Sequence, residues 1–154
     1  MKLLPSLPLV GLAVVLALNA GGCAGLEGLG RLIPGFNTVT VEVVNDTGFA
    51  VDPNIRFDDD AGFFAGLLPA DTLDTGLIPP GEARSYTFDC DELGLIVSDE
   101  AEQVIPLFGT YTADKTANIE RGEEFDCGDV IRFRFVGDGV DFGVIVSVNG
   151  KIVD

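Results

Sequence analysis

Residues 130–148 read VIRFRFVGDGVDFGVIVSV and carry the clearest strand pattern in the chain. On both sides of the central Gly-Asp-Gly, apolar side chains recur at every second position, as they do in strands that bury one face. The glycines and the aspartate supply turn chemistry between the two halves, so the stretch predicts two consecutive strands. Asn149-Gly150 follows directly and is typical of a type I′ hairpin turn, which predicts another strand beyond it.

The same two-residue period extends back to residue 36. Val39, Val41 and Val43 share one face of a predicted strand, and a further strand is expected over residues 84–90. Turn residues separate about seven to eight such strands along the chain. This pattern favours an all-β fold, an antiparallel β-sandwich of immunoglobulin-like size, with a flattened β-barrel as the alternative.

One short helix is expected among these strands. Leu-Ile-Val at residues 95–97 predicts a brief strand, and Ser98 then has the side chain of a helix N-cap. Asp99 and Glu100 would occupy the first turn, where the helix dipole favours acidic residues. Because Pro106 follows closely, the helix must end before it.

The whole chain is strongly acidic. It has 154 residues, with 25 acidic and 9 basic side chains, no His and a formal net charge of −16 at pH 7. This length predicts a single domain, and the charge disfavours nucleic acid as a partner because its phosphates would be repelled. The absence of His excludes every Ser-His or Cys-His catalytic pair and every His-bearing zinc site.

Residues 1–22, MKLLPSLPLVGLAVVLALNAGG, have the pattern of an export signal. Lys2 is a short positive region, residues 7–18 are almost wholly apolar, and small residues close the segment. The apolar core is shorter than the roughly 20 residues that a membrane-spanning helix needs. We therefore expect the chain to be exported from the cytoplasm.

The end of this segment, Ala20-Gly21-Gly22-Cys23, resembles the lipobox of bacterial lipoproteins, in which a small residue directly precedes the cysteine that becomes acylated. The resemblance covers the export region only, and no domain family is recognised in residues 36–154.

The resemblance implies that Cys23 carries the lipid and becomes the mature N-terminus, attached stably to a membrane. Residues 23–35, rich in Gly, would form a flexible tether. With Ala24 after the cysteine, the implied address is the bacterial outer membrane, on its periplasmic or its surface face. Ordinary secretion with cleavage near Ala20 and an uncleaved anchor helix are the alternatives.

Three cysteines are consistent with export. If Cys23 is acylated, Cys90 and Cys127 remain as a pair, and each follows a Phe-Asp dipeptide. Residues two apart share a face of a strand, so both cysteines would point inward, as a buried disulfide between elements needs. The 37-residue separation predicts about 3–4 kcal/mol of stabilisation. A metal site that uses both thiolates with Asp89 or Asp129 is the alternative.

Two acidic clusters are candidate calcium sites, since calcium prefers several oxygen ligands and tolerates irregular geometry. The denser cluster contains Asp58, Asp59 and Asp60, with Asp52 nearby. The other groups acidic residues around the two cysteines: Asp89, Asp91, Glu92, Asp126 and Asp129. The plainer interpretation of both clusters is a solvated acidic surface.

No catalytic motif is complete in this sequence. Gly137-Asp138-Gly139 opens a dinucleotide-binding pattern that Phe142 breaks, and Gly150 lacks the upstream glycine of a phosphate loop. We therefore expect no enzyme, and no cofactor other than calcium.

The function that these features favour is that of a lipid-anchored binding module in the cell envelope. Its partners would be the membrane, through Cys23, and an envelope protein or polysaccharide, but not nucleic acid. A small calcium- or metal-dependent acidic enzyme and a purely structural envelope lipoprotein are the alternatives.

Overall fold

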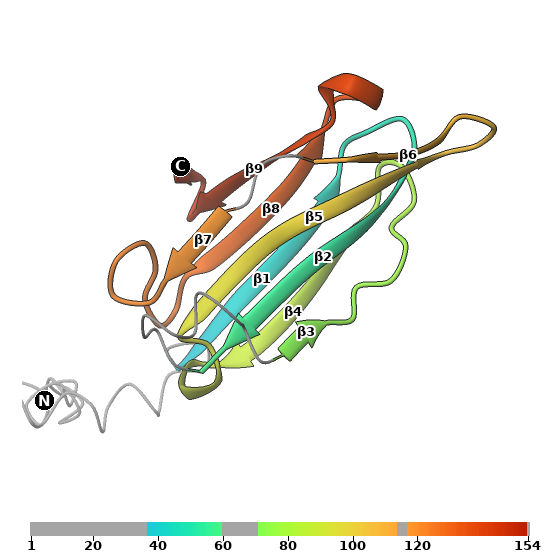
Figure 1. The fold of residues 1–154 in the computed structure, drawn as a ribbon. Coiled ribbons are helices and arrows are strands. Elements are labelled where there is room, and N and C mark those ends of the chain that lie inside the picture. Colours follow the sequence, from blue (N-terminus) through green and yellow to red (C-terminus); the bar gives the residue numbers. More distant parts are fainter. Residues whose placement is uncertain (1–36, 60–70, 114–116, 154) are drawn as a thin grey trace, which may run out of the picture. The chain divides into compact units, whose positions relative to one another are not determined.

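The computed structural model describes residues 37–59, 71–113 and 117–153 (Figure 1). All of them belong to one compact unit, residues 35–154. The expected export signal, the tether and Cys23 lie outside the described residues. Within the described part of the chain, no helix is long and apolar enough to cross a membrane.

Two sheets make up this unit. Sheet A has the strand order β10-β9-β8-β1-β4, and sheet B has the order β3-β2-β5-β6 with β7 also paired to β5. The strands are β1 (Thr38–Asn45), β2 (Ala50–Asp58), β3 (Asp71–Leu73), β4 (Ala83–Asp89), β5 (Leu95–Ile105), β6 (Gly109–Thr112), β7 (Ala117–Glu120), β8 (Val130–Val136), β9 (Gly143–Val148) and β10 (Lys151–Val153), with 3-10 turns η5 (Cys90–Glu92) and η6 (Gly139–Asp141).

The predicted all-β sandwich is confirmed, and neither sheet closes into a barrel within the described residues. The ten strands of the described residues exceed the seven or eight expected, because β3 and β6 have only three and four residues and are too short to show alternation. One pairing is also parallel. β1 lies between β4, to which it is antiparallel, and β8, to which it is parallel.

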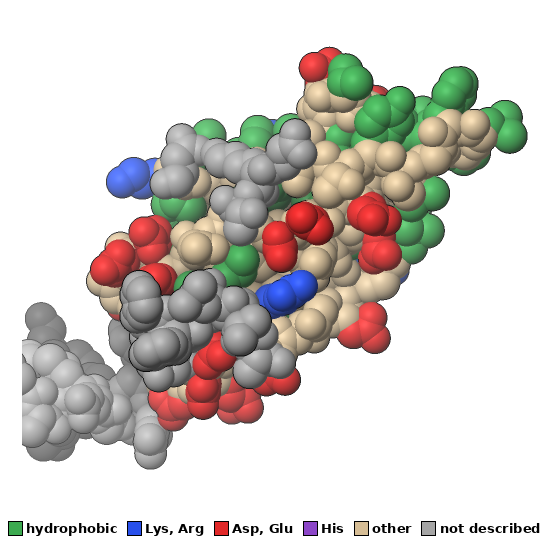
Figure 2. Space-filling view, in the orientation of Figure 1, with side chains coloured by type: hydrophobic (Ala, Val, Ile, Leu, Met, Phe, Trp, Pro, Cys, Tyr) green, Lys and Arg blue, Asp and Glu red, His purple; other side chains and the backbone are tan. Residues whose placement is uncertain are grey.

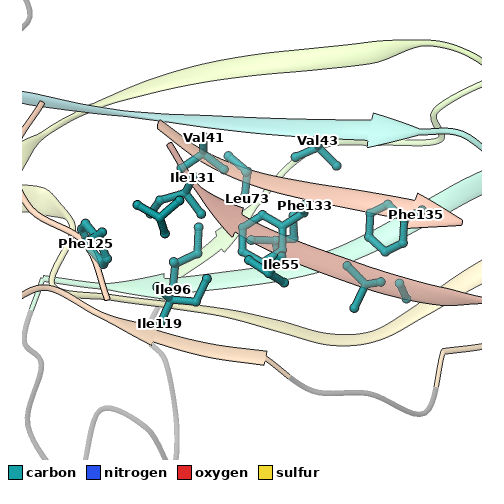
Figure 3. Close-up of a cluster of buried hydrophobic side chains, with 14 of the residues drawn as sticks. Val41, Val43, Ile55, Leu73, Ile96, Ile119, Phe125, Ile131, Phe133 and Phe135 are labelled. Atoms are coloured by element: carbon teal, nitrogen blue, oxygen red, sulfur yellow. The ribbon is translucent and has the colours of Figure 1, made fainter. Parts of the chain in front are cut away.

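The core lies between the facing sides of the two sheets (Figure 3). The alternating residues of β1 and β8 fill it from sheet A, and isoleucines meet them from sheet B. Each of these residues is at most 1% exposed: Val39, Val41, Val43, Ile131, Phe133, Phe135, Ile55, Ile96 and Ile119. The alternation that predicted the strands therefore identifies the residues that hold the two sheets together.

The prediction of a helix after residue 97 is wrong, because β5 continues as one strand of 11 residues. The register between β2 and β5 shifts where Asp52 and Asn54 of β2 face Glu102 and Asp99 of β5, so β5 has one extra residue there. Glu100 lies in this bulge with a φ of 22°. A bulge reverses the alternation of inward and outward side chains, and the broken pattern resembles a strand end followed by a helix.

The turns predicted at Gly137–Gly139 and at Asn149-Gly150 are both present. Asn149 and Gly150 have φ values of 51° and 80°, as a type I′ turn requires, and β9 pairs with β10 across them. Gly137 has a φ of 74°, and a Cβ atom there would lie 2.1 Å from the carbonyl oxygen of Asp141. Only glycine fits that position.

The long strands run between two ends of the sandwich. At the end where β1 and β8 begin, the Cys90 N–H donates to the carbonyl of Asn37 (2.9 Å); we call this the disulfide end, defined by Cys90 and Cys127. β5 finishes at the other end, where the β5–β6 hairpin projects near η6 (Figure 1); we call this the hairpin end. With 11 residues, β5 alone spans about 35 Å between them.

Candidate functional site

Cys90 and Cys127 form a disulfide, with their Cα atoms 5.6 Å apart. The bond joins η5, which follows β4, to the connection that precedes β8. The Arg121 guanidinium donates to the carbonyl of Cys90, and the Gly128 N–H donates to the carbonyl of Thr38 (2.8 Å). The pairing expected from the cysteine count is therefore present. The disulfide joins the two segments whose backbone hydrogen bonds hold the start of β1.

The expected burial of this disulfide is only half right. Cys90 is 1% exposed and Phe125 is 2% exposed, but Cys127 is exposed. Cys127 lies in a turn between β7 and β8, where the alternation of a strand does not apply. The Phe-Asp-Cys context therefore predicted the pairing correctly and the position of the second cysteine incorrectly.

Two of the three aspartates of the first acidic cluster lie in the described part of the chain. Asp58 ends β2 and Asp59 follows it, whereas Asp60 lies outside the described residues. Asp52 does not join them, because it lies six positions before Asp58 in the extended strand β2, which corresponds to roughly 20 Å.

An open depression of about 390 Å³ lies beside this cluster, at the disulfide end. It is lined by five acidic side chains and two aromatic rings: Asp58, Asp59, Asp71, Asp91, Glu92, Phe57 and Phe88. Across residues 37–59, 71–113 and 117–153, however, no three acidic side chains are grouped so that they could hold a metal ion. Calcium binding stays a prediction, and the change in melting temperature on adding millimolar calcium would test it.

In the second acidic cluster, Asp129 has a structural role. One of its carboxylate oxygens accepts from the Asp126 N–H (2.7 Å), and the other accepts from the side-chain amide of Asn149 (2.6 Å). The Asn149 side-chain oxygen in turn accepts from the Val130 N–H (3.0 Å). These bonds tie the start of β8 to the β9–β10 turn.

The outer faces of the two sheets differ in charge. On sheet A, Arg132 pairs with Glu42 (Nε to Oε2, 2.7 Å) and Arg134 pairs with Asp46, beside an open depression of about 390 Å³. On sheet B, whose outer face is turned toward the viewer in Figure 2, acidic side chains gather over β2 and β5. Arg132 and Arg134 already have carboxylate partners, so within the described residues these two side chains do not form an unpaired cationic pair that could hold an anion.

Exposed apolar side chains mark the hairpin end, and the sequence analysis did not identify them. Leu107 is fully exposed, and Phe108 and Val140 are 78% and 89% exposed. Leu107 also has a φ of 73°, a left-handed conformation that costs a non-glycine residue about 1–2 kcal/mol. A signal was available in the sequence, because residues 103–113 are eleven consecutive uncharged residues in a chain that is 22% charged.

A buried amide holds the loops of the hairpin end together. Gln103 of β5 is fully buried, and its side-chain nitrogen donates to Asp138 Oδ1 (2.9 Å) and to the carbonyl of Gly137 (3.2 Å). Its side-chain oxygen accepts from the Gly139 N–H (2.8 Å), and Asp138 Oδ1 also accepts from the Gly48 N–H (2.9 Å). The strand that carries the hairpin is thus bonded to the loop that carries η6.

Comparisons with models of known protein families and with curated proteins find no match for this chain.

Proposed function

We propose that this protein is an exported, lipid-anchored β-sandwich that acts as a binding module of the bacterial cell envelope and performs no catalysis. The observation that carries the proposal is the Cys90–Cys127 disulfide. Disulfides persist in oxidising compartments outside the cytoplasm. The bond uses two of the three cysteines, so Cys23, the lipobox-like cysteine, is left for acylation.

A binding role is supported by how the molecule uses its side chains. Asp129 and Asp138, two carboxylates at opposite ends of the sandwich, accept hydrogen bonds from the backbone and so serve the fold. Leu107 and Phe108 contribute little to the core because they are largely exposed. Exposed apolar residues on a rigid frame are the usual anchors of protein recognition.

The anchor is tested by growing cells with a clickable fatty-acid analogue and comparing three forms of the full-length protein. Wild type and Cys90→Ser/Cys127→Ser are expected to incorporate the label and to fractionate with the outer membrane. Cys23→Ser is expected to lose the label and to appear in the soluble fraction. Unchanged membrane partitioning and labelling of Cys23→Ser would contradict the proposal.

A further inference from the structure

We propose that Leu107, Phe108 and Val140 form an apolar anchor that inserts into an apolar pocket of a partner protein whose rim is basic. We call these three residues the apolar tip. The inference rests on the proposed binding function and names its surface and its partner chemistry.

The apolar tip is not explained by the stability of the fold. Leu107, the most exposed of the three, lies in a left-handed backbone conformation that asparagine or glycine would adopt with less strain. Its side chain contributes no buried area in return. A residue with a strained backbone and a side chain that packs against nothing in the fold is expected where another molecule supplies the contact.

The tip is built on a rigid base. The Gln103 side chain bonds β5 to Gly137, Asp138 and Gly139 through three hydrogen bonds of 3.2 Å or less. A Cβ atom on Gly139 would lie 3.8 Å from Cζ of Tyr111, so η6 lies against β6 of the hairpin. The two segments that carry the tip are therefore held relative to each other before binding, which reduces the ordering entropy that association requires.

Charge identifies the kind of partner. Residues 103–113 carry no charge, but Asp138 and Asp141 flank Val140 and are exposed. The chain as a whole has a formal charge of −16. A second copy of the chain and an anionic lipid surface would both be repelled. Lysine or arginine at the rim of a pocket would be attracted to the acidic residues around the tip, and the uncharged tip could then enter the pocket.

The first experiment places the photo-crosslinking residue p-benzoylphenylalanine at position 108 of the full-length protein in cells of the source organism. The matched control carries the same residue at position 152, where Ile152 is 59% exposed on β10, away from the hairpin end. We expect one dominant crosslinked protein at position 108 that is absent at position 152. Crosslinks to phospholipid, crosslinks to the chain itself, or none at all would overturn the inference.

The second experiment measures the affinity of the purified crosslinked protein. We expect Leu107→Ser/Phe108→Ser to weaken binding at least tenfold with an unchanged melting temperature, Ile152→Ser to leave binding unchanged, and wild-type binding to weaken as salt rises from 50 to 500 mM. Equal affinity of the tip variant, or binding that does not depend on salt, would overturn the inference. Fractionation of the same cells separates the two proposals. A lipid-anchored protein that gives no crosslink would contradict only the inference about the apolar tip. A protein that crosslinks to a partner but carries no lipid would contradict only the proposed anchor.

Discussion

The two ends of the sandwich are held by different chemistry. At the disulfide end, a covalent bond and backbone hydrogen bonds fix β1 between its neighbours, and Arg121 and Asp129 are bonded to this frame. At the hairpin end, the buried Gln103 amide bonds β5 to the loop that carries η6, and the apolar side chains of the tip are exposed to solvent. The side chains of the disulfide end therefore stabilise the fold, whereas at the hairpin end a hydrogen-bonded base carries exposed side chains that are available for binding.

Removing the disulfide is expected to have the largest effect. Cys90→Ser/Cys127→Ser frees a 37-residue loop in the unfolded chain, which lowers the free energy of unfolding by about 3–4 kcal/mol. Urea denaturation with and without reductant measures this loss. Reductant should destabilise the wild type and leave the double variant unchanged. A wild type that is insensitive to reductant would show that the bond does not stabilise the disulfide end.

The hairpin end should be most sensitive at Gly137. Gly137→Ala introduces a Cβ atom 2.1 Å from the Asp141 carbonyl oxygen at a φ of 74°, and we expect a loss of about 2–4 kcal/mol from overpacking and backbone strain. Gly150→Ala is the matched control, because its φ is 80° but its Cβ would meet nothing within 4 Å. The control should lose about 1–2 kcal/mol from backbone strain alone. Equal losses in thermal denaturation would contradict the close approach at Gly137.

The amide network should have the next effect. Gln103→Leu removes one of the two N–H donors to Asp138 Oδ1 and the acceptor of the Gly139 N–H, and we expect a loss of about 1–3 kcal/mol of unfolding free energy. Glu102→Gln changes the neighbouring exposed residue and should stay within about 0.5 kcal/mol of the wild type. Urea denaturation of the three proteins makes the comparison. A Gln103→Leu protein as stable as the wild type would mean that the network does not hold the hairpin end.

The smallest expected effect has the opposite sign. Leu107→Asn replaces a fully exposed leucine in a left-handed conformation with a residue that adopts it more readily, so stability should stay equal or rise by about 0.5–1 kcal/mol. Differential scanning calorimetry measures the change. A clear loss of stability would give Leu107 a structural role and weaken its assignment to the apolar tip.

How far the sequence predicts this structure depends on how local the signal is. The alternation of residues 130–148 identified Phe133 and Phe135 as core residues because side-chain direction in a strand has a period of two. The bulge at Glu100 broke that period, so β5 was misread as a strand followed by a helix. Alternation says nothing about loops, and the exposure of Cys127 could not be read from it.

The candidate site was less predictable than the fold. Gln103 and Asp138 lie 35 residues apart, and their bond depends on how the two sheets pack. The exposure of Leu107 depends on the same packing, since an apolar residue in a short turn has no periodic partner that would place it inside or outside. The uncharged run over residues 103–113 was visible, but it is equally typical of a buried strand.

We propose that the three cysteines have two separate roles: Cys90 and Cys127 crosslink the sandwich, and Cys23 carries the lipid anchor. Mass spectrometry of a non-reduced digest of the protein from the cell envelope tests this claim most directly. We expect a Cys90–Cys127 linked peptide together with an N-terminal peptide that begins at an acylated Cys23. Free thiols at Cys90 and Cys127, or a Cys23 that is unmodified or still preceded by residues 1–22, would contradict it.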